Sequence, residues 1–522
     1  MIPMAPNETF ACGAARNVTL NTGYQKGANL VGDQPWGRHF LVYGFGVILM
    51  NLLPALMVPI YTHRVSPLEF GVLELLNRSQ EILRVVLSLG LASALTTFYQ
   101  MKKDEPHLQK GIYSTAVQFL LVVGLVVTLV LLAGAGKMSR TLFNTSSYKS
   151  AVVLILAATY FEMLFQMAVL NLQSGLRSSL YVTAHVSRLL LAIVLNLVLV
   201  YWFRLGLMGV LWATLIHTSV FSIGLLAYMF SRTGRAFHTR LMWEMLRFGL
   251  PLLPASAIGF FFNNGDRYFL NAFRSPAEVG FYGLGYKLGM MSMLLVIMPF
   301  GKIWSVTMVD ISGRSDGPRE MGRIATLLLM ACTASMLGLS LFGPYLVRIM
   351  APPAYSAASQ VIPVVGIAYL FYAWTMVMDA SFYVTKRTFY KPIILAISSV
   401  AMAALYWGLI PHYGMMGAAW ATLGGFAIFS VVTLIFAQRV YYIDYEFGRI
   451  GALTAMGIGL YLAGNLISVA SLVPGLLGRA AILLLFPTIL WIGGFFTDSE
   501  KRIMGNYCLG LRLRFQNSVS PT

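Results

Sequence analysis

The sequence predicts an all-α, polytopic integral membrane protein with about 14 transmembrane helices. They are arranged as two parallel six-helix repeats that form two lobes, followed by two C-terminal helices. Three observations lead to this fold class. First, 58% of the 522 residues are hydrophobic and only 11% are charged, whereas a soluble domain carries about 25% charged residues. Second, apolar runs of about 20 residues, each long enough to cross ~30 Å of hydrocarbon, recur along the whole chain. Third, two sequence motifs occur twice at nearly the same separation.

The expected spans follow from these apolar runs in order. Six fill the first half, near 39–61, 70–98, 112–134, 150–172, 181–203 and 207–230. Six fill the second half, near 248–270, 279–306, 323–345, 359–383, 389–411 and 415–437. Two more lie near 450–470 and 475–496. The chain is therefore expected to begin with a cytoplasmic tail (1–37), followed by an N-lobe (38–230) and a C-lobe (248–438). Two additional helices (449–496) and a cytoplasmic basic tail (497–522) complete it.

The repeated motifs relate the two halves. Residues 66–71 read Ser-Pro-Leu-Glu-Phe-Gly and residues 275–280 read Ser-Pro-Ala-Glu-Val-Gly, an offset of 209 residues. Residues 206–215 and 414–423 share the pattern Gly-x-Met-Gly-x-x-Trp-Ala-Thr-Leu at an offset of 208. Two matches at nearly one offset indicate internal duplication. An even number of helices per repeat makes the repeats parallel, as in transporters whose substrate passes between two lobes that rock against each other.

Lys and Arg are concentrated in connections of one parity, near 100–110, 231–247 and 384–391, and in the tail after 497. Because cytoplasmic loops carry the excess of positive charge, both termini are expected in the cytoplasm. Such loops also lie against anionic membrane lipids. The net charge of +18 is spread over short loops, so the chain lacks the basic, solvated face of a nucleic-acid-binding protein.

No residue pattern predicts a metal or cofactor site. Cys12, Cys332 and Cys508 are far apart and have no metal-ligand spacing. Gly136-Lys137 lacks the first glycine and the hydroxyl residue of a phosphate-binding loop. We therefore expect no cofactor and no direct use of ATP, and we hypothesise coupling to a proton or sodium gradient.

The second span carries the densest charge inside the membrane. At 100° per residue, an arc of roughly 120° holds its polar side chains, Glu74, Asn77, Arg78, Glu81, Arg84 and Ser88. Four charges facing lipid would cost roughly 10–14 kcal/mol, at about 3 kcal/mol each. The stripe is therefore expected to face a wet cavity or polar partners. Alternatively, Glu74–Arg78 and Glu81–Arg84 pair along the helix and only hold it in place.

Other spans repeat this pattern with fewer charges. Polar residues share one helix face in the fourth span (Glu162, Gln166, Gln173) and in the fifth (His185, Arg188, Asn196), and others lie in later spans (Lys287, Tyr372, Asp379, Tyr383). Asp266 and Arg267 are expected at the membrane surface, where a charge costs little free energy, and are set aside. Intramembrane charges are functional candidates because their insertion is unfavourable.

Collected together, Arg78, Arg84, Arg188 and Lys287 would form an electropositive cavity between the lobes, with Glu74 and Glu81 beside them as substrate-binding candidates. The planar guanidinium group of arginine binds two phosphate oxygens at once. Such a cavity suits a substrate whose anionic head crosses the protein while its long apolar tail stays in lipid. Glu162 and Asp379 are the candidate ion-coupling residues.

Four segments resemble a known family. Residues 248–254 (Phe-Gly-Leu-Pro-Leu-Leu-Pro), 266–270 (Asp-Arg-Tyr-Phe-Leu) and 275–282 (Ser-Pro-Ala-Glu-Val-Gly-Phe-Tyr) are similar to bacterial polysaccharide flippases of the O-antigen type. These belong to the multidrug/oligosaccharidyl-lipid/polysaccharide exporter superfamily. Residues 409–422 look like the twelfth-helix signature of that family, and the likeness runs from about residue 40 to 450.

The resemblance implies movement of an undecaprenyl-diphosphate-linked oligosaccharide across the bacterial cytoplasmic (inner) membrane, between two six-helix lobes in a V around a cationic cavity. It implies no catalytic residue. The expected partners are the polyprenyl-diphosphate-linked glycan, membrane lipids, and a glycan polymerase or other polysaccharide-assembly proteins. Many members stop at 12 helices, whereas lipid II flippases of the same superfamily often have 14.

Two other functions remain open. An ion-coupled multidrug antiporter of the same superfamily would use acidic cavity residues for cationic drugs, a role that Glu162 and Asp379 could fill. A membrane enzyme of lipid-linked glycan assembly would need a sizeable extracytoplasmic loop, and no such connection exceeds roughly 20 residues. The sequence therefore favours a transporter over an enzyme.

Overall fold

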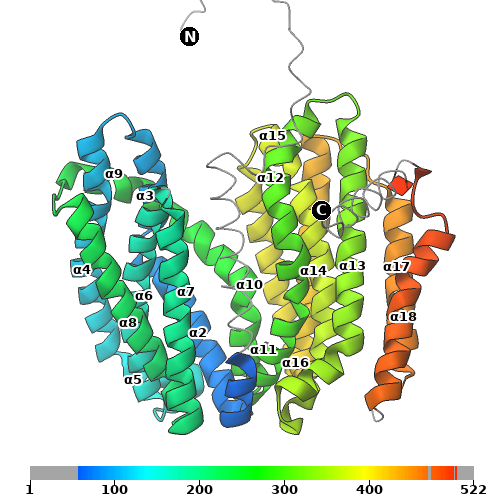
Figure 1. Ribbon diagram of the computed structural model, residues 1–522, viewed down its shortest axis with the longest axis horizontal. Coiled ribbons are helices and arrows are strands. Elements are labelled where there is room, and N and C mark those ends of the chain that lie inside the picture. The colour runs from blue at the N-terminus through cyan, green and yellow to red at the C-terminus, as the bar shows by residue number, and fades with distance from the viewer. Residues whose placement is uncertain (1–56, 176, 468–471, 499, 502–522) are drawn as a thin grey trace, which may run out of the picture.

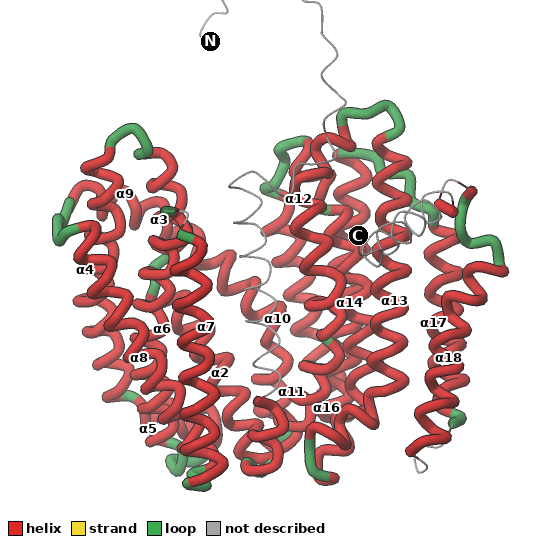
Figure 2. The backbone as a smooth tube through the Cα atoms, viewed as in Figure 1, coloured by secondary structure: helices red, strands yellow, loops and turns green. Residues whose placement is uncertain are grey.

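A computed structural model describes residues 57–175, 177–467, 472–498 and 500–501. These residues form helices joined by short connections, and no strand occurs among them (Figure 2). The tail 1–37, most of the first expected span 39–61 and most of the tail 497–522 lie outside the described residues.

The helices form two groups that stand side by side and meet near one end (Figure 1). The N-lobe contains α2 (Pro67–Leu87), α3 (Leu91–Met101), α4 (Pro106–Ala133), α5 (Ala135–Phe143), α6 (Lys149–Ser174), α7 (Ser178–Asn196) and α8 (Gly206–Thr233). The C-lobe contains α10 (Leu253–Phe273), α11 (Pro276–Gly289), α12 (Met298–Ser312), α13 (Gly317–Met350), α14 (Val361–Met378), α15 (Ala380–Val384) and α16 (Tyr390–Val440). The last two helices, α17 (Phe447–Asn465) and α18 (Leu472–Ile492), pack beside α13 at the outer edge of the C-lobe.

Eleven helical runs in the described part of the chain are long and apolar enough to cross a membrane, and the pair α2 and α3, bent by 46°, brings the number to 12 when it is counted as one span. The 51 residues of α16 would extend ~76 Å as one helix, far more than the bilayer core. Its backbone reverses at Gly414 (φ 54°, ψ −132°), and Met402 packs against Gly425. α16 therefore contains both expected spans 389–411 and 415–437, which brings the fold into agreement with the predicted count of about 14.

Two helices were not expected: α5, which lies between the predicted spans 112–134 and 150–172, and α9 (Thr239–Gly249). The connection 231–247, predicted as a basic loop, ends in α9, which lies on the N-lobe and leads into α10. Its apolar residues recur at helical spacing, so that Leu241, Met242 and Met245 are buried, while Arg240 and Arg247 remain exposed. A short amphipathic helix of this kind has no long apolar run, so the apolar runs of the sequence do not predict it.

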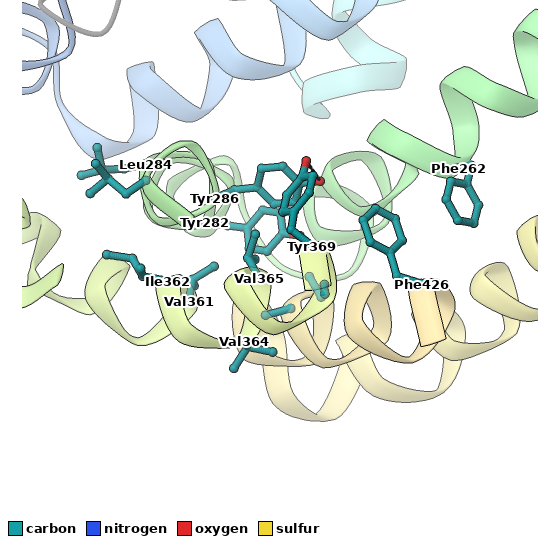
Figure 3. Close-up of a cluster of buried hydrophobic side chains, with 14 of the residues drawn as sticks. Phe262, Tyr282, Leu284, Tyr286, Val361, Ile362, Val364, Val365, Tyr369 and Phe426 are labelled. Carbon is teal, nitrogen blue, oxygen red and sulfur yellow. Dashed lines mark hydrogen bonds between the residues drawn. The ribbon is translucent and has the colours of Figure 1, made fainter. Parts of the chain in front are cut away.

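The C-lobe core is aromatic at the level of α11 (Figure 3). Tyr282 and Tyr286 of α11 are buried against α14 and α16, and Phe262 of α10 stacks on Phe426 of α16 with ring centroids 5.2 Å apart. The hydroxyl groups of Tyr286 and Tyr369 are 3.2 Å apart, so the apolar core also holds a chain of buried polar groups.

Within each lobe, the two repeated motifs come together. In the C-lobe, the carboxylate of Glu278 accepts a hydrogen bond of 3.0 Å from the backbone N–H of Met415, next to Gly414. In the N-lobe, Glu69 lies next to Gly206, which has the same positive φ of 54°. A glutamate at the start of one span thus faces the glycine that opens a later span in both halves, which explains why the two motifs recur together.

Candidate functional site

α2 places the charged stripe at the joint between the lobes. Its N-terminus is fixed by a capping box, in which the Ser66 hydroxyl accepts from the Glu69 N–H and the Glu69 carboxylate accepts from the Ser66 N–H. The helix then packs against α6 of its own lobe and against α10 and α11 of the C-lobe. The stripe from Glu74 to Arg84 therefore lies between the lobes rather than toward lipid.

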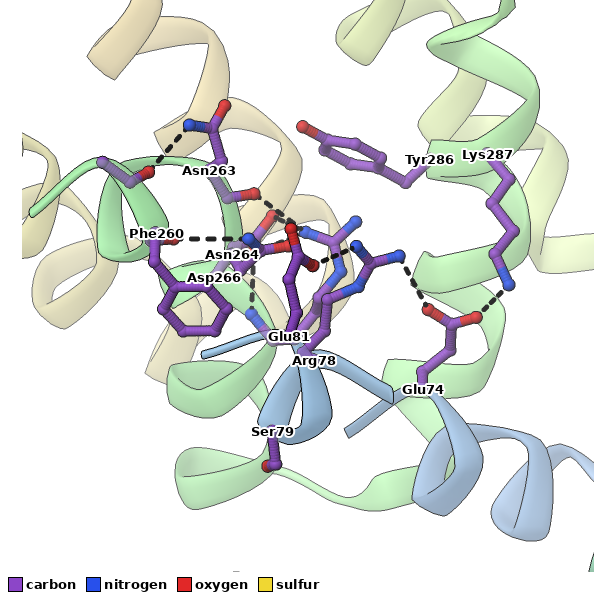
Figure 4. Close-up of polar contacts among 12 residues, drawn as sticks. Glu74, Arg78, Ser79, Glu81, Phe260, Asn263, Asn264, Asp266, Tyr286 and Lys287 are labelled. Carbon is purple, nitrogen blue, oxygen red and sulfur yellow. Dashed lines mark hydrogen bonds and ion pairs between the residues drawn. The ribbon is translucent and has the colours of Figure 1, made fainter. Parts of the chain in front are cut away.

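Glu74 is the centre of the first charged cluster (Figure 4). Only 1% of its side chain is exposed, and it forms ion pairs with Lys287 of α11 and with Arg78, whose Nη2 lies 3.7 Å away. Arg78 also pairs with Glu81 at 3.1 Å. The structure thus brings together four of the expected site residues, and the Glu74–Lys287 pair joins the two lobes. We call these four residues the interlobe cluster.

Next to the interlobe cluster lies an ion pair that was set aside from the sequence as lying at the membrane surface. The side chains of Asp266 and Arg267 are only 1% and 3% exposed, with Arg267 Nη1 2.7 Å from the Asp266 carboxylate, so the pair is buried inside the protein. The Tyr282 hydroxyl donates to Asp266 at 2.5 Å, and the guanidinium of Arg267 lies 4.1 Å from the Tyr286 ring centroid.

The second cluster lies inside the N-lobe and is centred on Glu162 of α6. Arg188 of α7 forms a two-pronged ion pair with its carboxylate, and Arg84 of α2 approaches it to 3.6 Å. Gln166 donates a hydrogen bond of 2.9 Å to the same carboxylate. Arg188 also donates from Nε to Nδ1 of His217, at 3.3 Å. We call Glu162, Arg84, Arg188 and His217 the N-lobe cluster.

The expected pairing of Glu81 with Arg84 along α2 is therefore wrong. Glu81 forms its ion pair with Arg78, and Arg84 forms one with Glu162 on α6. A helix offers each charge partners three or four residues away, but a neighbouring helix can offer a better placed one. Sequence spacing alone could not distinguish these choices.

Asp379 belongs to neither cluster. It pairs with Lys391 of α16 at 2.8 Å, and Lys391 also donates to the Tyr383 hydroxyl at 3.0 Å. The four expected cations thus do not form one uncompensated group. The interlobe cluster has two cations and two carboxylates, whereas the N-lobe cluster has two arginines on one carboxylate and a formal charge of +1 when His217 is neutral. Among the described residues, no group of three or more His, Cys, Asp or Glu side chains could hold a metal ion.

Comparisons with known proteins agree with this architecture. A model of the polysaccharide biosynthesis protein family matches residues 37–304. Among solved structures, the chain is similar to the lipid II flippase MurJ in an inward closed conformation, with a TM-score of 0.70 at 14% sequence identity over 88% of this chain and 100% of that one. None of the curated protein sequences compared with the chain matches it.

Two further solved structures share the fold. One is an inward-facing multidrug resistance MATE family transporter of the MOP superfamily (TM-score 0.62, 16% identity, 80% of this chain and 99% of that one). The other is a MOP superfamily transporter from Pyrococcus furiosus (TM-score 0.57, 15% identity, 80% and 96%). The chain is thus a multi-pass membrane protein with the fold of these structures, as the sequence predicts.

Proposed function

The chain belongs to the polysaccharide biosynthesis protein family, and from that premise we propose that it flips an undecaprenyl-diphosphate-linked oligosaccharide across the bacterial cytoplasmic membrane. The substrate is the lipid-linked repeat unit of a polysaccharide. Transport proceeds by alternating access through a cationic cavity between the lobes, with both termini in the cytoplasm. A glycan polymerase or another polysaccharide-assembly protein receives the flipped unit.

The N-lobe cluster is the observation that carries this proposal. Arg84 and Arg188 share the single carboxylate of Glu162, so one positive charge is left to attract an anion. Arg84 is 34% exposed and extends from α2, the helix that lies between the lobes. A diphosphate bound there would satisfy guanidinium groups that Glu162 alone does not saturate, while the polyprenyl tail remains in lipid.

The interlobe cluster has a second role in this mechanism. Glu74 of α2 and Lys287 of α11 belong to different lobes, so rocking of one lobe against the other changes their separation. Lys287 and Arg78 become available to the substrate when that separation grows. Glu74 and Glu81 then act as the carboxylates that hold these cations while no substrate is bound.

The energy for net movement comes from a proton or sodium gradient in this proposal, with Glu162 and Asp379 as the coupling residues. Each of the two has a cationic partner within its own lobe. A cation from solution would therefore compete with an arginine or lysine side chain for the carboxylate, which ties ion binding to side-chain movement.

A drug antiporter is the second candidate, because the MATE fold is shared. It would need carboxylates free to receive a cationic drug. Glu162 accepts from two arginines, and Asp379 is paired with Lys391. This pairing favours an anionic substrate over a cationic one.

The test is a leaflet assay in proteoliposomes with a prenyl-diphosphate-linked oligosaccharide, whose glycan is probed by a reagent added outside. Wild type should change the fraction of glycan that is protected. Arg84→Gln, which removes the excess cation while Arg188 still pairs with Glu162, should reduce the rate at least about tenfold if the lost interaction is worth about 1.4 kcal/mol. Arg240→Gln, at a position that is 95% exposed, should behave as wild type.

Two outcomes would contradict the proposal. If wild type moves cationic dyes and leaves the glycan in place, the protein is a drug exporter. If Arg84→Gln flips the glycan as fast as Arg240→Gln, the N-lobe cluster is not in the substrate path.

A further inference from the structure

The imidazole of His217 is held as a hydrogen-bond acceptor by a positively charged neighbour. Arg188 donates from Nε to Nδ1 of His217 at 3.3 Å, so Nδ1 carries no proton and the ring is neutral. The other side of the same guanidinium binds Glu162. Arg188 therefore bridges a carboxylate and a neutral histidine in the interior of the N-lobe.

The polar groups in and around the N-lobe cluster come from three helices packed on or near α8, and of these Arg188 and Glu162 act directly on His217. α6 contributes Glu162 and Gln166, α7 contributes Arg188 and His185, and α2 contributes Arg84. The span Leu108–Ala133 of α4 has Lys110 in its first turn as its one charged residue, and the turn Leu197–Trp202 after α7 has none. The charge near His217 is thus set by one carboxylate and two arginines.

Protonation of His217 is unfavourable while the cluster is empty. It would remove the hydrogen bond from Arg188, because two N–H donors would then face each other, and it would add a third cation beside one carboxylate. When an anion with two negative charges binds to Arg84 and Arg188, the net charge of the cluster changes from +1 to −1. The cluster then attracts a proton. The proton comes from water and binds at Nδ1, after Arg188 has turned its Nε toward the anion.

We propose that binding of a disubstituted diphosphate by Arg84 and Arg188 is coupled to the uptake of one proton by His217. The inference rests on the proposed function in its choice of anion. By thermodynamic reciprocity, a proton that favours the anion is itself bound more tightly when the anion is present. Release of the substrate would then also release the proton, on whichever side of the membrane the cluster is open.

His217 is better placed for this role than the other titratable groups of the cluster. Glu162 accepts hydrogen bonds from Arg188 and Gln166 and forms an ion pair with Arg84, so all three groups oppose its protonation. The ring of His185 packs against Phe165 and Tyr181 at centroid distances of 5.4 and 4.7 Å, and no hydrogen bond joins it to Arg188 among the described residues. Of the two histidines, only His217 shares a hydrogen bond with the arginine that the anion would recruit.

The experiment is calorimetric binding of a short-chain prenyl diphosphate monosaccharide, a diester whose two charges do not titrate near neutrality. The full chain in nanodiscs is titrated at about pH 6 and about pH 8, on either side of the ordinary histidine pKa of about 6.5. At each pH, two buffers of different ionisation enthalpy report the protons taken up. Wild type should take up protons and bind more tightly at the lower pH, by up to about tenfold per pH unit where uptake is complete.

Two matched variants assign the proton. His217→Asn keeps an acceptor oxygen near the position of Nδ1 but cannot titrate there, so it should bind with a flat pH dependence and no proton uptake. His185→Asn should keep the wild-type dependence. Ring ¹⁵N spectra of wild type should show the His217 signal, assigned by its loss in His217→Asn, becoming that of imidazolium when the probe is added.

The possible results separate the proton linkage from the transport proposal. Binding without proton uptake in wild type, or unchanged uptake in His217→Asn, would exclude His217 and leave the proposed transport standing. Absence of any binding would remove the anion site itself. Linked binding without flipping in the leaflet assay would refute the transport proposal and leave the proton linkage intact.

Discussion

Gly71 of α2 and Gly280 of α11 occupy equivalent positions in the two repeats, and at both the backbones of the two lobes are in close contact. A Cβ on Gly71 would overlap the carbonyl oxygen of Pro276, and a Cβ on Gly280 would overlap that of Pro67. The contact therefore reads the same when the halves are exchanged, as expected where a twofold axis passes between parallel repeats. The lobes meet on an axis made by the first motif of each repeat.

Replacing either glycine by alanine should push the lobes apart, because the obstacle is backbone that cannot move aside as a side chain does. We expect Gly71→Ala to destabilise the protein by at least about 1–3 kcal/mol, the usual range for overpacking. Thermal unfolding in detergent measures this. Gly224→Ala is the matched control, since a Cβ there meets nothing within 4 Å, and an equal effect of both variants would refute the role of the joint.

The fold was predictable because its signals are local. A run of apolar residues marks a span wherever it lies, and the motif offset of 209 residues reported the duplication. Residues at equivalent positions of two repeats need not be in contact, however. The offset therefore could not show that Gly71 contacts the second copy of its own motif. The same holds for the site residues. Lys287 could be recognised as an intramembrane charge, but its contact with Glu74 could not be predicted, because the two positions are 213 residues apart.

The Glu74–Lys287 pair allows a double-mutant test of the joint. Lys287→Met should be strongly destabilising, by roughly 3–5 kcal/mol, because it leaves the buried carboxylate of Glu74 with Arg78 alone. Glu74→Gln together with Lys287→Met should recover a large part of that loss, because no unpaired charge remains. Unfolding midpoints of the two single variants and the double variant give the coupling energy, and strictly additive effects would show that the pair does not join the lobes.

The glycines at the start of the second motif should respond unequally to alanine. Gly206 and Gly414 both have φ 54°, and a positive φ costs other residues at least roughly 1–2 kcal/mol. A Cβ on Gly206 would lie 3.7 Å from Glu69, whereas one on Gly414 would overlap the Glu278 carboxylate. Gly414→Ala should therefore lower the unfolding temperature more than Gly206→Ala. Equal losses would mean that the Glu278 contact adds nothing to backbone strain.

Glu500 should make the attachment of the last two helices sensitive to acid. It bridges Arg323 of α13 and Arg449 of α17, at 2.8 and 3.1 Å. Burial by itself raises the pKa of this carboxyl, but hydrogen bonds from Thr497 and the two arginines outweigh burial and hold the pKa below its usual value. Such a group stabilises the fold fully above its unfolded pKa of about 4.3 and loses this contribution as the pH falls through the lower folded value.

Glu500→Gln should accordingly lower the unfolding temperature at neutral pH, and its difference from wild type should shrink as the pH falls below about 4.3. Glu244→Gln, which removes a surface partner of Arg240, should have little effect at either pH. A Glu500→Gln difference that stays constant into acid would show that the charge of Glu500 is not what stabilises this contact.

Ion coupling can be located by comparing Glu162 with Asp379, since the two carboxylates lie in different lobes with separate partners. If a gradient drives flipping, collapsing the proton and sodium gradients with ionophores should reduce transport to the rate of passive equilibration. Asp379→Asn should then abolish the response to the gradient if the C-lobe carries the ion. Glu162→Gln should change substrate binding as well and make it tighter, because it frees both arginines of the N-lobe cluster for the anion. Separate measurements of binding and of gradient-driven flipping distinguish these effects.

Flipping that continues unchanged without any gradient would exclude both carboxylates as coupling sites, and the lobes would then move under the substrate gradient alone.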